Sequence, residues 1–128
     1  MARDVIHSEK APKAIGPYSQ AIAVSSGRMV FLSGQIPLDP ATGEIIAGDV
    51  SAQTQQVMLN LEAVLAAAGC TFANVVRCGI FLTDLADFGK VNEIYGRYFP
   101  VHPPARATVQ VSALPRGAKV EIDCIAVE

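Results

Sequence analysis

The 128-residue sequence lacks the features that mark several specialised classes of protein. Its ten basic and twelve acidic residues give a net charge of −2, so charge favours neither nucleic acid nor an anionic membrane as a partner. Aromatic residues make up only 6% of the chain and form no pattern typical of a base-stacking platform. No apolar run approaches the length of a membrane span. These absences argue against a nucleic-acid or membrane partner.

Histidine and cysteine are also scarce. His7 and His102 are far apart, and neither joins a cysteine or acidic cluster at metal-ligand spacing, so we expect no metal and no cofactor. The three cysteines, Cys70, Cys78 and Cys124, stand in apolar surroundings and indicate buried, reduced thiols. The chain opens on polar residues rather than on a signal peptide. Together these features predict a cytoplasmic protein.

Apolar residues, by contrast, are abundant. They account for 51% of the chain, enough for a full core without disulfide or metal crosslinks. No low-complexity stretch, internal repeat or linker divides the sequence. We therefore expect one domain that spans residues 1–128.

The spacing of the apolar residues predicts two helices and several strands. One helix is expected over 50–68, capped by Asp49 or Ser51 and ended by Gly69, with a buried face of Val57, Leu61, Val64, Leu65 and Ala68. The other is expected over 87–99 and is stopped by proline. Strands are expected over 5–7, 17–24, 29–33, 75–83, 104–109 and from 120 onwards.

Two hairpins are expected among these strands. Ser26-Gly27 would turn strand 17–24 into strand 29–33, and residues 114–117 would join the last two strands. The order is then hairpin, helix, strand, helix, hairpin. It indicates an α+β fold, with two helices packed on one face of a mostly antiparallel sheet.

The last two strands carry the most informative polar residues. If they pair as expected, alternation places Arg106 and Glu121 on the same face of the sheet, away from the helices. A guanidinium fork suits a carboxylate, and a nearby glutamate can move a proton or polarise a water. The pair is therefore a candidate site for a small carboxylic acid. From alternation alone, a surface ion pair between neighbouring strands is the favoured alternative.

The face that bears this pair also carries aliphatic side chains. Ile125 and Val127 fall on the same side as Glu121 if the alternation holds. A sheet face that mixes aliphatic and charged groups is poorly suited to bare solvent. Association with other subunits through this face would resolve the problem and would place the candidate site near an interface, where concave sites form readily.

Four stretches, in this order along essentially the whole chain, resemble the RidA (YjgF) family of reactive-intermediate deaminases. They are Gly16-Pro17-Tyr18-Ser19-Gln20-Ala21, Ser33-Gly34-Gln35-Ile36-Pro37, Pro104-Ala105-Arg106 and Val120-Glu121-Ile122. The resemblance implies a chorismate-mutase-like (ferredoxin-like) fold, a barrel-like homotrimer and sites in clefts between subunits. It also implies cofactor-free hydrolysis of short 2-imino or 2-enamino acids, such as 2-iminobutanoate and 2-iminopropanoate, to the 2-keto acid and ammonia.

The same resemblance assigns roles residue by residue. It implies that Arg106 clamps the substrate carboxylate. Glu121 matches the acid that assists, often through water, the attack at C2 and the departure of ammonia. With the resemblance, the carboxylate site becomes the favoured interpretation of this pair.

Five further residues match positions that line the family site. The backbone groups of Gly34 and Thr108 line it, while Ser33 supplies a hydroxyl at a strand end and Tyr18 a ring that helps close the pocket. Asn92 matches an asparagine of the second helix with a structural rather than a catalytic role. Thr108 is a departure, because many family deaminases carry cysteine there. Threonine can supply the same backbone groups as cysteine. A substrate preference that depends on the side chain can differ.

Three functions can be considered for such a chain. An imine deaminase is favoured by the combined pattern. A module that binds or senses keto acids without turnover would keep Arg106 but need no proton transfer by Glu121. A role on nucleic acid, described for some relatives, is opposed by the net charge and the missing basic run. Turnover separates the first two, and salt-dependent RNA binding would support the third.

Overall fold

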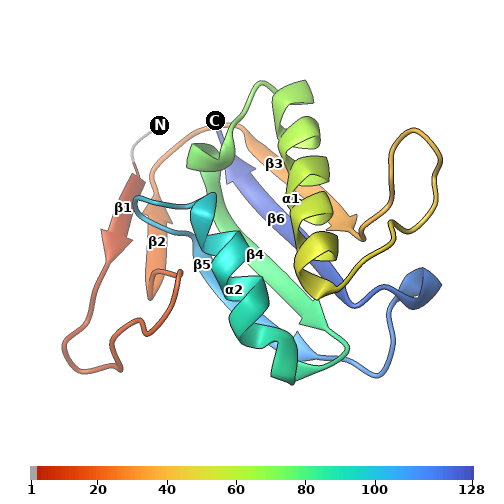
Figure 1. Ribbon diagram of the computed structural model, residues 1–128. Helices are drawn as coiled ribbons and strands as arrows, with labels where there is room; N and C mark the ends of the chain where they lie inside the picture. Colours follow the sequence, from red (N-terminus) through yellow and green to blue (C-terminus); the bar gives the residue numbers. More distant parts are fainter. Residues whose placement is uncertain (1–2) are drawn as a thin grey trace.

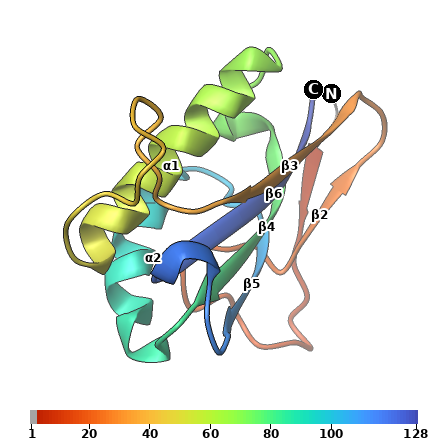
Figure 2. The ribbon, with the colours of Figure 1, turned by 90° about the vertical axis from the view of Figure 1, so that its right-hand side faces the viewer.

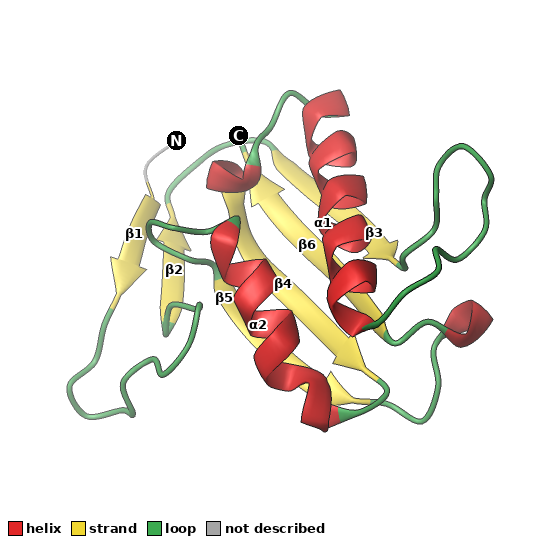
Figure 3. Ribbon diagram, viewed as in Figure 1, coloured by secondary structure: helices red, strands yellow, loops and turns green. Residues whose placement is uncertain are grey.

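The computed structural model describes residues 3–128 as a sheet with two helices packed on one side (Figures 1 and 3). The strands are β1 (Arg3–Ile6), β2 (Ala21–Val24), β3 (Met29–Gln35), β4 (Val75–Leu82), β5 (Ala105–Gln110) and β6 (Val120–Val127). The helices are α1 (Val50–Ala67) and α2 (Phe88–Arg97). Seen from the side, both helices cover the same face of the sheet (Figure 2). The predicted α+β class, with two helices on one face, is confirmed.

Four strands form the main sheet in the order β3-β6-β4-β5. β6 is antiparallel to both β3 and β4, whereas β4 and β5 are parallel. A parallel pair needs a crossover connection, and α2 supplies it between β4 and β5. β1 and β2 form a separate antiparallel pair, which lies on the side of the sheet away from the helices (Figure 2).

Both predicted hairpins are wrong. β5 and β6 are not neighbours, because β4 lies between them. β2 pairs with β1 rather than with β3. The segment before β2 is held beside the start of β5, where the backbone N–H of Ser19 donates to the carbonyl of Pro104 at 3.1 Å and its hydroxyl donates to the carbonyl of Pro103. These bonds hold the segment before β2 beside β5, which is the edge of the main sheet opposite to β3.

The first helix follows its sequence signals closely. Asp49 caps its start by accepting a hydrogen bond from the Ala52 N–H at 3.0 Å, and Gly69 follows its end with a φ of +77°. Val57, Leu61 and Leu65 are fully buried, as expected. The prediction that Val64 is buried is wrong, because it is 39% exposed on the outer side of the helix.

The two faces of the sheet differ in cover. Side chains that point towards the helices form the core, among them Leu32 of β3, Cys78 and Ile80 of β4, and Ile122 of β6. The opposite face leaves Met29 57%, Phe31 70% and Val109 45% exposed. We call this the open face of the sheet. Its apolar character agrees with the sequence expectation of a face unsuited to solvent.

The cysteines behave as predicted, since all three are free and buried. No helix within residues 3–128 is long and apolar enough to cross a membrane.

Candidate functional site

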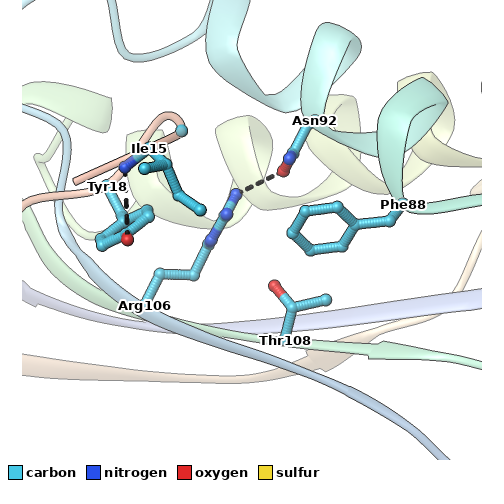
Figure 4. A pocket seen from close by; sticks show the side chains of 7 residues that line it. Ile15, Tyr18, Phe88, Asn92, Arg106 and Thr108 are labelled. Carbon is cyan, nitrogen blue, oxygen red and sulfur yellow. Dashed lines mark hydrogen bonds between the residues drawn. The ribbon is translucent and has the colours of Figure 1, made fainter. Parts of the chain in front are cut away.

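A cavity of about 250 Å³ lies at the edge of the sheet, between β5, the start of α2 and the loop that precedes β2 (Figure 4). Its lining residues are Ile15, Gly16, Tyr18, Phe88, Asn92, Arg106 and Thr108. Ligand pockets for drug-sized molecules run from roughly 300 to 1,000 Å³, so this one suits a smaller molecule. We call it the arginine pocket.

Arg106 is fixed within this pocket by its neighbours. Its guanidinium carbon lies 5.5 Å from the ring centroid of Tyr18, 5.6 Å from that of Phe88 and 5.2 Å from that of Tyr95. Its Nη1 donates a hydrogen bond of 2.6 Å to Oδ1 of Asn92. Ring faces attract a cation, and the amide fixes one end of the fork, so the guanidinium is oriented before any ligand arrives.

Arg106 carries a charge that the fold does not neutralise. It makes no salt bridge among residues 3–128, so the interpretation of Arg106 and Glu121 as a surface ion pair is wrong. Burial lowers the pKa of Arg106 from its usual value because the guanidinium has lost part of its water. Arginine nevertheless stays protonated in proteins, and only one of its five N–H donors is used by Asn92. The pocket can therefore accept an anion, and a carboxylate matches the fork.

Glu121 lies on the other face of the sheet. Arg106 is paired with the buried Cys78, which faces the helices, whereas Glu121 is paired with Phe81 and alternates with the buried Val120. The expectation that the guanidinium and the carboxylate share one face is wrong. Arg106 points towards α2 and Glu121 to the open face, so the sheet separates the two groups within one chain.

Ser33 and Gly34 accompany Glu121 at the junction of β3 and β6. β3 is irregular there, with a register shift between Leu32 and Gln35 that leaves Ser33 and Gly34 exposed. A Cβ added to Gly34 would lie 2.3 Å from Oε2 of Glu121, so only glycine lets the carboxylate lie across the strand. We call these three residues the glutamate cluster.

Gly34→Ala is expected to displace the Glu121 carboxylate with little effect on stability. The atom that collides is the end of a flexible side chain, which can move aside. If Glu121 has the role that the family resemblance implies, misplacing its carboxylate by about 1 Å costs on the order of 10²-fold in rate. Turnover in a deaminase assay, measured beside a thermal melt, checks this. Gly89→Ala is the matched control, because its added Cβ meets nothing within 4 Å; equal turnover in both variants would contradict the prediction.

The structure thus sorts the predicted site residues into two groups. Tyr18, Asn92 and Thr108 join Arg106 in the arginine pocket, while Ser33 and Gly34 join Glu121 on the open face. Sequence reasoning assigned no site role to Ile15, Gly16, Phe88 or Tyr95. A signal for two of them was available: Phe88, Asn92 and Tyr95 recur at helical spacing, so they share the face of α2 that meets Arg106.

Neither group brings several histidine, cysteine or acidic side chains together. Residues 3–128 contain no cluster of three or more histidine, cysteine or acidic side chains that could hold an ion. Cys78 and Cys124, whose sulfur atoms lie 3.3 Å apart beneath the arginine pocket, are buried thiols. The hydrogen bond between them, together with burial, raises the pKa of Cys124 and keeps it protonated.

A family model described as Endoribonuclease L-PSP matches residues 8–128. The chain belongs to this family, the RidA (YjgF) or Rid family. Similar proteins cover it almost completely. Protein DfrA of Myxococcus xanthus is 72% identical over 127 residues, which are 99% of this chain and 97% of that protein. The 2-iminobutanoate/2-iminopropanoate deaminase of Mus musculus is 52% identical over 126 residues, which are 98% of this chain and 92% of that protein.

Solved structures of Rid proteins share the fold. RidA of the Antarctic bacterium Psychrobacter sp. is 44% identical, with a TM-score of 0.76 over 98% of this chain and 99% of that one. A Rid protein of Yersinia pestis named YyfB is 32% identical, with a TM-score of 0.91 over the whole of both chains. The family that the four sequence stretches indicated is therefore confirmed.

Proposed function

We propose that this protein hydrolyses short 2-imino and 2-enamino acids, such as 2-iminobutanoate and 2-iminopropanoate, to the 2-keto acid and ammonia. The observation that carries the proposal is the arginine pocket, which holds an oriented guanidinium without a carboxylate partner among residues 3–128. Relatives at about half identity that are named 2-iminobutanoate/2-iminopropanoate deaminases support the choice of substrate class.

The chemistry asked of the residues is modest. An imine carbon is already electrophilic, so the protein needs to hold the carboxylate, steer one water and exclude competing nucleophiles. Arg106 binds the carboxylate with its free N–H groups. Glu121 takes a proton from the water that attacks C2 and passes it to the imine nitrogen, which gives a carbinolamine. The hydroxyl of the carbinolamine then loses its proton through the same carboxylate to the nitrogen as the C2–N bond breaks, so ammonia leaves and the keto acid remains. General acid–base assistance of this kind contributes roughly 10²–10⁴-fold.

The two groups must come from different chains if they act on one small molecule. Arg106 and Glu121 lie on opposite faces of their own sheet, so the sheet itself keeps a substrate of about six or seven heavy atoms from contacting both side chains of one chain. We infer that the arginine pocket of one subunit meets the glutamate cluster of the next in a homotrimer. The exposed apolar side chains of the open face, led by Phe31 at 70%, support burial of that face against another subunit.

Light scattering is expected to give three times the chain mass of 13.5 kDa at micromolar concentration. Phe31→Glu should dissociate the assembly, because a buried unpaired charge would sit in the interface. Leu59→Glu is the matched control: Leu59 is 44% exposed on α1, on the helix side of the sheet, and its exchange should leave the mass unchanged. A stable wild-type monomer would contradict the shared site.

The activity itself is tested in a coupled assay. A pyridoxal-phosphate threonine or serine dehydratase releases the imine, and keto-acid formation is followed with and without this protein. The proposal expects faster keto-acid release when the protein is present, and an unchanged rate would contradict it.

A non-catalytic role has one observation in its favour. The arginine pocket is complete within a single chain and can bind a keto acid without Glu121. If the protein binds 2-oxobutanoate but leaves the coupled rate unchanged, sensing or binding of keto acids is the better function. The family description as an endoribonuclease finds little support in a chain with a net charge of −2.

A further inference from the structure

The fold leaves the hydroxyl of Thr108 without a hydrogen-bond partner. β5 puts this side chain on the same face as Arg106, two residues further along the strand, and it lines the arginine pocket (Figure 4). Its Oγ1 is buried and finds no partner in the part of the chain that the structure describes. Most buried hydroxyl groups in proteins are paired, so this one needs an explanation.

Packing does not explain a threonine here. Valine has nearly the same shape and is equally well suited to a strand, but it brings no polar atom to bury. Exchanging such a hydroxyl for a methyl group removes an unpaired group and costs the fold nothing. The hydroxyl is therefore better explained by a molecule that enters the pocket than by the fold.

We propose that the Thr108 hydroxyl bonds the nitrogen or oxygen atom at C2 of the ligand and thereby selects 2-imino and 2-keto acids over simple carboxylic acids. This inference rests on the proposed function. Arg106 holds the carboxylate, and C2 is the next atom of the ligand. Thr108 stands at the next same-face position of β5, roughly 7 Å along the strand. Figure 4 shows its hydroxyl oxygen on the side nearer Arg106 and its methyl group on the other side.

A hydroxyl can form a hydrogen bond with both the imine substrate and the keto-acid product. It accepts a hydrogen bond from the N–H of the imine and donates one to the oxygen that replaces it, whereas a thiol does both weakly. Thr108 forms no covalent bond and takes no proton in this account. Its contacts are hydrogen bonds only, and the ring of Phe88 at the same pocket leaves an apolar wall for the rest of the ligand.

Two ligands and three proteins test this. Binding of 2-oxobutanoate, and of butanoate, which lacks the C2 oxygen, is measured by titration calorimetry on the wild type, Thr108→Val and Thr108→Ser. Thr108→Val should weaken the binding of 2-oxobutanoate about tenfold, which corresponds to the loss of one good hydrogen bond. It should change the affinity for butanoate by less than about twofold. Thr108→Ser keeps the hydroxyl and should retain the preference for 2-oxobutanoate. The thermal melt of Thr108→Val should equal or exceed that of the wild type.

The other outcomes overturn the inference. If the binding of both ligands is weakened equally, the hydroxyl bonds the carboxylate instead of the atom at C2. Unchanged binding of both, or a lowered melting temperature with unchanged binding, would leave it a packing residue. If Thr108→Val does not fold, Thr108→Ala removes the same group. The readout is binding, so a C2 preference that depends on Thr108, found without turnover in the coupled assay, would contradict the proposed function and keep this inference.

Discussion

Arg106→Ala is expected to lower kcat/KM for imine hydrolysis by about 10²-fold or more. The variant loses the fork that would grip the substrate carboxylate with two charge-assisted hydrogen bonds, each worth roughly 1.5–3 kcal/mol. Arg106→Lys should rescue it poorly, because an ammonium is a point charge without the planar fork. Steady-state kinetics and a thermal melt of each variant are the measurements.

The arginine pocket explains why stability should change little. Arg106 has no ion-pair partner among residues 3–128, so its removal strands no buried carboxylate. Arg97→Ala is the matched control: it removes an arginine from the exposed end of α2, where the side chain pairs with Glu93 at 3.0 Å. That variant should keep full turnover. Near-wild-type kcat/KM in folded Arg106→Ala protein would overturn the assignment of Arg106.

Glu121→Gln is expected to lower kcat by about 10²–10⁴-fold, while binding of 2-oxobutanoate stays close to that of the wild type. Glutamine keeps the shape of the side chain but can neither take a proton from water nor return it to ammonia. Kinetics and product binding, measured on the same preparation, separate the two effects.

Asp123→Asn provides the control for charge on the same face. Asp123 stands two residues further along β6, and its Oδ1 accepts a hydrogen bond from the Gly79 N–H at 3.0 Å. An asparagine oxygen can accept the same bond, so turnover should be retained. An unaltered kcat in Glu121→Gln would leave the arginine pocket as the binding site and remove the glutamate from the mechanism.

The elements of this fold are predictable from sequence more readily than their order in the sheet. Helical spacing and caps define α1, because every signal acts within a few residues of the element it marks. Strand pairing depends on connections. The helix between β4 and β5 is a crossover, and such a connection joins parallel neighbours, which puts β5 at the far edge and admits β6 beside β4. The predicted hairpin between the last two strands is incompatible with that constraint.

The facing of Arg106 shows a second limit. Alternation fixes which residues share a face but not which face is covered, and a placement of Arg106 away from the helices turns the apolar Ala107 and Val109 towards them. In the structure both are exposed on the open face, and Arg106 turns inwards. It can do so because β5 is an edge strand, where α2 presents Phe88 and Asn92 instead of a closed core. The family resemblance indicates which residues line the site, but not on which face of the sheet each of them lies.

Mixed assemblies of the Arg106→Ala and Glu121→Gln variants test the proposed shared site most directly. Arg106→Ala and Glu121→Gln chains with different tags are co-expressed, and assemblies that carry both tags are assayed for imine hydrolysis. If one chain of a trimer supplies Arg106 and its neighbour Glu121, each mixed trimer regains both groups at one of its three interfaces, so assemblies that carry both tags should show about a third of the wild-type turnover. If both groups act from one chain, no site regains the pair. Turnover no higher than that of the separate variants would then contradict the account.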